Sequence, residues 1–200
     1  GVLDYRFNNL DVLRAERGCL VIANHPSLLD YVLLASVMNE TDCLVKSALL
    51  RNPFVSGVIR AADYLINSEA DTLLAASQQR LAQGDTLLIF PEGTRTRVGE
   101  AMTLQRGAAN IAVRCNSAVR VVVIHCSERM LDKQSNWYNV PPNKPVFTVD
   151  VRERINIHDF YDASQHEPAL AARQLNRHMQ HQLTTGLQSL SGTKDASALS

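Results

Sequence analysis

The stretch that decides the fold is residues 19–30, CLVIANHPSLLD. It opens with a short apolar run of strand length, and the apolar positions after Ser27 follow helical spacing, with Ser27 as a candidate N-cap. Residues 86–96, TLLIFPEGTRT, repeat the pattern of an apolar run followed by a polar turn. Continuous apolar runs are typical of strands buried on both faces, as in sheets covered by helices on each side.

Strand-like and helix-like segments alternate along the rest of the chain. We expect further strands at 43–45, 64–66, 119–124 and 146–157, and helices at 52–60, 68–83, 104–114 and 167–190. This alternation predicts a single α/β domain with a mostly parallel or mixed central sheet and helices on both faces. We expect the domain to span residues 1–190, with a motif-bearing core at 18–126, and residues 191–200 to form a disordered tail.

Composition limits the classes of partner. The 200 residues suit one domain, and 20 Lys plus Arg against 20 Asp plus Glu leave no formal net charge. A nucleic-acid partner is therefore not expected, and an anionic ligand must be held by local groups. The four cysteines form no CxxC pair, which favours a reducing compartment. No apolar run approaches the roughly 18–20 residues of a bilayer span, although an anchor before Gly1 stays open.

His25 stands where the first apolar run ends, and Asp30 follows in the first turns of the expected helix. Functional sites in α/β sheets gather at the carboxyl ends of strands. There, a carboxylate bonded to one ring nitrogen fixes the histidine tautomer and leaves the other nitrogen as a base. For an isolated pair at this spacing, the simpler interpretation is favoured, in which His25 caps the helix and Asp30 is a charge at its N-terminus.

The turn after the second apolar run is a candidate anion site. Gly93 permits an unusual backbone angle, and backbone amides together with Thr94 and Arg95 could receive an anion. An ordinary strand-ending turn with a solvated Arg95 explains the same residues equally well.

Together the two segments resemble the glycerolipid acyltransferase family, whose best-known member is lysophosphatidate acyltransferase. The resemblance is carried by Asn-His-x-Ser-x-x-Asp at 24–30 and by Phe-Pro-Glu-Gly-Thr-Arg at 90–95, in the family's order, spacing and strand context. The segments 46–54 and 105–109 are also similar to family segments. The resemblance covers residues 18–126.

The resemblance implies transfer of a fatty acyl group from acyl-CoA or acyl carrier protein to the hydroxyl of a lysophospholipid or glycerol-phosphate-like acceptor. It implies that His25 is the general base and that Asp30 orients it. It also implies these substrate-binding residues: Asn24, Ser27, Lys46, Glu92, Gly93, Thr94 and Arg95. No metal and no cofactor beyond the acyl co-substrate are implied, and the chain has no GxSxG nucleophile motif.

Asn67 departs from the family pattern, which has a phosphate-binding arginine there. An amide cannot form a bidentate charged pair with phosphate, so one alternative is the same chemistry on a non-phosphate lipid acceptor, unless Arg60, Arg97 or Lys46 substitutes. Another alternative is a lipid-binding domain without turnover, and thioester hydrolysis is a lesser variant. A lipid acceptor predicts a place at the cytoplasmic face of the cell membrane, peripheral or anchored by a segment before Gly1.

Overall fold

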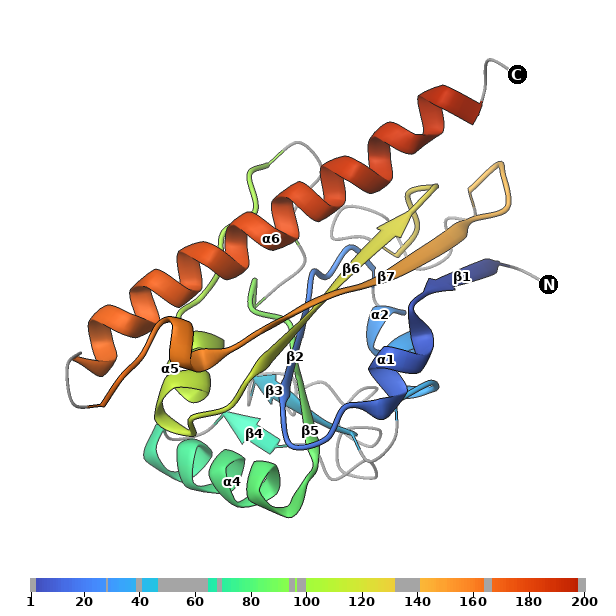
Figure 1. The fold of residues 1–200 in the computed structure, drawn as a ribbon. Helices are drawn as coiled ribbons and strands as arrows, with labels where there is room; N and C mark the ends of the chain where they lie inside the picture. The colour runs from blue at the N-terminus through green and yellow to red at the C-terminus, as the bar shows by residue number, and fades with distance from the viewer. Residues whose placement is uncertain are drawn as a thin grey trace.

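The computed structural model describes residues 3–27, 29–38, 41–46, 65–67, 70–93, 96, 100–131, 141–163 and 167–197. Within them, seven strands form one sheet in the order β1-β7-β6-β2-β5-β3-β4 (Figure 1). The strands are β1 (Asp4–Asn8), β2 (Leu20–Ala23), β3 (Thr41–Lys46), β4 (Leu65–Asn67), β5 (Thr86–Ile89), β6 (Val119–Cys126) and β7 (Val146–Ile155). Every neighbouring pair is parallel except β6 and β7, which are antiparallel.

Helices cover both faces of this sheet. Helices α1 (Leu10–Ala15) and α2 (Asp30–Ala35) share one hydrophobic cluster with the strands. The opposite cluster holds α4 (Ala70–Gln83), α5 (Gly107–Arg114) and α6 (Pro168–Ser197), and Figure 1 shows α6 lying across the sheet. A short 3-10 helix, η2 (Ile157–Asp159), follows β7. The predicted α/β domain with a mostly parallel sheet is confirmed.

The two apolar runs form the centre of the sheet. Every residue of β2 and of β5 is buried. Because side chains alternate along a strand, Leu20 and Ile22 pack towards α4, α5 and α6, whereas Val21 and Ala23 pack towards α1 and α2. The sequences of β2 and β5 do not alternate between polar and apolar residues, because both faces of these strands are covered by helices.

Several boundaries differ from the sequence prediction. Helix α6 continues to Ser197, so the expectation of a disordered tail from Ser191 is wrong as far as the helix extends. Helix α2 begins at Asp30, and its N-cap position is Leu29 rather than Ser27. Strand β1 and helix α1 were not predicted, because β1 is mostly exposed and lacks a clear apolar pattern. The helix expected at 52–60 lies outside the described residues.

The topology creates a crevice where β2 and β5 end. These strands are parallel neighbours, with Leu20 paired to Leu87. The chain leaves β2 towards α2 on one face of the sheet and leaves β5 towards α5 on the other. Ligand sites of open α/β sheets lie at such points, because diverging connections leave room beyond the strand ends. Of the helices in the described residues, none has the length and apolar character needed to cross a membrane.

Candidate active site

His25 and Asp30 form a hydrogen-bonded pair at the carboxyl end of β2. Asp30 is the first residue of α2, and its Oδ2 lies 2.9 Å from Nδ1 of His25. A carboxylate can only accept, so Nδ1 carries the proton and Nε2 is left unprotonated when the imidazole is neutral. Nε2 makes no hydrogen bond with any residue that the structure describes. The structure therefore places the Asp30 carboxylate against the His25 ring, as the sequence predicts.

Asp30 is fully buried, and its surroundings hold it in place. The same Oδ2 accepts a hydrogen bond from the backbone N–H of Ser27 at 2.7 Å. Burial raises the pKa of the Asp30 carboxyl, because a charge in the protein interior loses its hydration; the bond from His25 opposes this shift. Nearby negative charge on Glu92 raises the pKa of Asp30 further. Oδ1 of Asp30 has no hydrogen-bond partner among the described residues.

Phe90 fixes the plane of the His25 ring from the neighbouring strand. It follows β5 directly, and its ring stacks on the imidazole with centroids 4.4 Å apart and planes 28° apart. The imidazole is thus held by a hydrogen bond at one edge and by an aromatic face. The side chain of His25 is 19% exposed, so the ring is still accessible to a substrate.

Asn24 and Ser27 are buried and bonded within the protein. The Asn24 amide donates to the carbonyl of Ile124 and accepts from its N–H, both at 2.7 Å, which ties the end of β2 to β6. The Ser27 hydroxyl accepts a hydrogen bond from Leu29 N–H at 3.3 Å. In this structure both side chains shape the loop that carries His25, and their predicted contacts with substrate stay predictions.

Glu92 joins the β5 turn to the histidine loop. Its Oε1 accepts a hydrogen bond from the backbone N–H of His25 at 2.8 Å. Its Oε2 accepts from the backbone N–H of Thr96 at 3.0 Å and from the Thr96 hydroxyl. Gly93 follows with a φ of +69°, a left-handed conformation that glycine adopts without steric cost, and its N–H bonds the carbonyl of Phe90.

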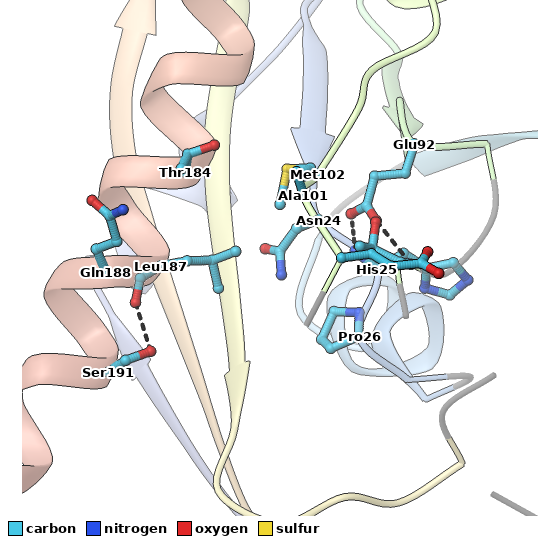
Figure 2. Close-up of a pocket in the computed structure, with 12 residues that line it drawn as sticks. Asn24, His25, Pro26, Glu92, Ala101, Met102, Thr184, Leu187, Gln188 and Ser191 are labelled. Carbon is cyan, nitrogen blue, oxygen red and sulfur yellow. Dashed lines mark hydrogen bonds between the residues drawn. The ribbon is translucent and has the colours of Figure 1, made fainter. Parts of the chain in front are cut away.

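A cavity of about 410 Å³ lies between these loops and α6. Figure 2 shows Asn24, Pro26 and Glu92 on one side and residues of α6 on the other, with the His25 imidazole on the side away from α6. Its lining residues are Asn24, His25, Pro26, Glu92, Thr96, Glu100, Ala101, Met102, Thr184, Leu187, Gln188 and Ser191. Most of these residues are uncharged, and they include the two acidic residues Glu92 and Glu100.

Some predicted site residues are not placed beside this pair. Thr94 and Arg95 lie outside the described residues. Lys46 ends β3, and its backbone pairs in register with Asn67 of β4, but their side chains also lie outside what is described.

The sequence reasoning did not select Phe90, Thr96 or the α6 residues. Both Phe90 and Thr96 could have been selected, because Phe90 is the first residue of the second motif and Thr96 directly follows it. The α6 contribution had no local signal, since it depends on how a distant helix packs.

The described residues contain no cluster of three or more histidine, cysteine or acidic side chains arranged for a metal ion. The chemistry that these residues themselves offer is proton transfer at Nε2 of His25. The fold and the site thus define an α/β protein with a His–Asp acid–base pair at the carboxyl ends of its two central strands.

Comparison with known proteins narrows this class to one family. The model of the family described as Acyltransferase matches residues 4–127, and the chain belongs to that family. The resemblance to glycerolipid acyltransferases is thereby confirmed. The matched range contains both motifs and the strands β1 to β6.

Relatives carry a consistent name. The 1-acyl-sn-glycerol-3-phosphate acyltransferase of Helicobacter pylori is 30% identical over 112 residues, covering 52% of this chain and 47% of that protein. The human 1-acyl-sn-glycerol-3-phosphate acyltransferase beta is 28% identical over 143 residues, covering 68% and 48%. The chain spans about half the length of these relatives.

A solved structure shows the same fold. The crystal structure of the 1-acyl-sn-glycerophosphate (LPA) acyltransferase, PlsC, from Thermotoga maritima superposes with a TM-score of 0.66 at 20% identity. The match covers 94% of this chain and 73% of that chain. It therefore includes α6 as well as the motif-bearing core.

Proposed function

We propose that this protein transfers a fatty acyl group from a thioester donor to the hydroxyl of a lysophosphatidate-like acceptor, with His25 as the general base. The observation that carries the proposal is the His25–Asp30 bond, which leaves Nε2 as a base at the carboxyl ends of β2 and β5. Family membership and the names of the relatives support the reaction and the acceptor class.

The reaction needs one proton to be moved. Nε2 of His25 takes the proton of the acceptor hydroxyl while its oxygen attacks the thioester carbonyl carbon. The C–S bond then breaks, and the protonated imidazole returns the proton to the departing sulfur. The products are an ester and a free thiol. A well-placed base contributes about 10²–10⁴-fold to the rate.

Asp30 supports both protonation states of His25. It accepts from Nδ1 in the resting state and stabilises the imidazolium that forms during attack. Its burial strengthens this interaction, because the effective dielectric constant is lower than in water.

The donor and the place of action belong to the same proposal. We infer acyl-CoA or acyl carrier protein as the donor, because the family reaction starts from a thioester. We also infer a membrane-peripheral protein, because a lipid acceptor resides in a bilayer. Flotation of the full-length protein with anionic liposomes tests this; protein that stays at the bottom of the gradient contradicts it.

A second acceptor class is favoured by one residue. Asn67 stands where the family pattern has arginine, and a neutral amide binds phosphate more weakly than a guanidinium. A lipid acceptor without a phosphate would fit this change. Strong wild-type activity on lysophosphatidate excludes this alternative; activity confined to uncharged lipid alcohols supports it.

The test of the base is the His25→Ala variant, assayed with one labelled acyl donor and a panel of acceptors. We expect kcat to fall by about 10²-fold or more, because the general base is lost. His181→Ala is the matched control, since His181 is exposed on α6. Product analysis by mass spectrometry separates acyl transfer from thioester hydrolysis. If His25→Ala keeps activity within a few-fold, the assignment of the base is wrong.

A further inference from the structure

The carboxylate of Glu92 is already engaged inside the protein. One oxygen accepts from the backbone N–H of His25, and the other accepts from both the N–H and the hydroxyl of Thr96. Glu92 is 6% exposed, and Figure 2 shows its side chain reaching from the β5 turn to the histidine loop. The bond to His25 connects two loops that are distant in sequence and follow the neighbouring strands β2 and β5, whereas the bonds to Thr96 are local.

A role in holding the acceptor's phosphate does not suit this environment. Glu92 carries a charge of the same sign as a phosphate, and both of its carboxylate oxygens already accept hydrogen bonds from His25 and Thr96. A phosphate placed against the Glu92 carboxylate would meet a like charge, which is unfavourable.

The position of the His25 ring depends on the bond that Glu92 makes. The backbone of residues 25–27 is held at one end by Glu92 and at the other by Asp30, which accepts from Ser27 N–H. If the Glu92 bond is lost, only the Asp30 side and the stacking on Phe90 still locate the imidazole. A general base acts efficiently only within a narrow range of distances and angles.

We propose that Glu92 is a positioning residue, which places the general base through the backbone of His25, and that Thr96 completes this connection. The proposal rests on the proposed acyltransferase function for its kinetic readout. It differs from the motif-based expectation that Glu92 contacts the acceptor. It predicts that Glu92 affects the chemical step rather than acceptor binding.

Glu92→Gln tests the kinetic part of the proposal. The amide keeps one acceptor oxygen but cannot accept at both ends, so the loop loses one anchor. We expect kcat to fall by about 10–100-fold while the acceptor KM stays within about threefold. Glu167→Gln, an exposed position before α6, is the matched control. A raised acceptor KM with unchanged kcat overturns the proposal and supports direct acceptor contact; unchanged kinetics also overturns it.

Thr96 provides a conservative pair of variants. Thr96→Ser keeps the hydroxyl that bonds Glu92 and should retain wild-type kcat within about twofold. Thr96→Val keeps the shape but loses the hydroxyl, and its kcat should fall while KM is unchanged. Equal behaviour of the two variants would show that the hydroxyl plays no part in positioning.

A spectroscopic measurement separates this proposal from the proposed function. In protein with ¹⁵N-labelled histidine, the Nδ1–H proton of His25 should resonate at low field because it bonds Asp30. In Glu92→Gln this resonance should shift or broaden, whereas it should be unchanged in Glu167→Gln. If the wild type transfers no acyl group, the proposed function fails, yet this comparison still decides the positioning role. An unchanged His25 resonance in Glu92→Gln overturns it.

Discussion

The side chain of Asn24 continues the pairing of β2 with β6 beyond the last strand residue, making two hydrogen bonds to the backbone of Ile124, each of 2.7 Å. An asparagine amide has the same donor and acceptor as a peptide group, so it can replace one in a sheet. The chain can then turn away at His25 while the strand end stays bonded. The exposure of Asn24 is only 3%, which makes these bonds costly to lose.

Asn24→Ala is expected to lower the free energy of unfolding by about 2–4 kcal/mol, because it leaves the buried N–H and carbonyl of Ile124 without their hydrogen-bond partner. Urea denaturation followed by circular dichroism measures this. Asn143→Ala is the control, since Asn143 is exposed and its bond to Glu128 is 3.4 Å long. A loss below about 1 kcal/mol would contradict the inferred role of Asn24.

The buried Asp30 predicts a pH dependence of stability. Burial raises its pKa above the ordinary value of 3.8, so the folded state keeps the proton to a higher pH than the unfolded chain does. The free energy of unfolding therefore falls as the pH rises between the two pKa values. Asp30→Asn removes this titration, so the stability of the variant relative to the protein with Asp30 should increase as the pH rises above the ordinary pKa of 3.8.

The comparison for Asp30 is best made in the His25→Ala background, because this variant lacks the imidazole that bonds the Asp30 carboxylate. Denaturant unfolding at each pH gives the difference in free energy directly. A difference that stays constant, or that decreases with pH, is inconsistent with a raised pKa. In the protein that retains His25, Asp30→Asn should lower kcat, because the imidazole is no longer held in the productive tautomer.

The packing of α6 predicts opposite effects at two of its glycines. A Cβ on Gly186 would lie 2.6 Å from Cγ2 of Val123 and 3.3 Å from the Arg152 guanidinium, whereas a Cβ on Gly192 meets nothing within 4 Å. Gly186→Ala should destabilise the protein by about 1–3 kcal/mol through overpacking. Gly192→Ala should stabilise it by about 0.5–1 kcal/mol, because alanine favours the helix.

Thermal unfolding of the two variants under one set of conditions measures this contrast. A Gly186→Ala protein as stable as the wild type would mean that α6 does not approach β6 as closely as the structure shows. The contrast also tests whether the helix reaches Gly192, within the segment where the sequence predicts a tail.

Cys19 is predicted to be chemically inert in the folded protein. It is fully buried, and burial together with the neighbouring Glu16 carboxylate raises the pKa of its thiol to about 12. The thiolate is the reactive form, and it is scarcely populated near neutral pH. Iodoacetamide at about pH 8 should therefore leave Cys19 unmodified.

Peptide mass spectrometry of the alkylated protein reads out Cys19 directly. The same reaction in denaturant should label Cys19 fully and is the positive control. Labelling of Cys19 in the native protein would show that the packing around the start of β2 is looser than described.

Much of the fold follows from local patterns. The apolar runs that became β2 and β5 are continuous because these strands are covered on both faces, and Gly84 ends α4 with a positive φ of 94°, as its glycine predicts. Strand β1 escaped prediction because it lies mostly exposed and pairs with β7, far along the chain. Edge strands carry little burial, so their sequences carry little pattern.

The candidate site divides in the same way. His25 and Asp30 could be paired from sequence, because a short loop and a helix start bring them together within five positions. The roles of Phe90 and Glu92 could not be predicted from sequence, because both residues contact His25 from the turn after the neighbouring strand β5. The order of strands in the sheet depends on the whole chain, so a local motif does not determine which other loop packs beside it.

The residue types at 24–30 and 90–95 were enough to establish the family and the candidate base, because acid–base chemistry needs particular side chains at short spacing. The arrangement of those side chains came only from the folded molecule. There, Glu92 bonds the backbone of His25, Asn24 bonds β6, and α6 forms one wall of the cavity. These relations join residues far apart in the chain, and burial decides which of their polar groups must bond one another.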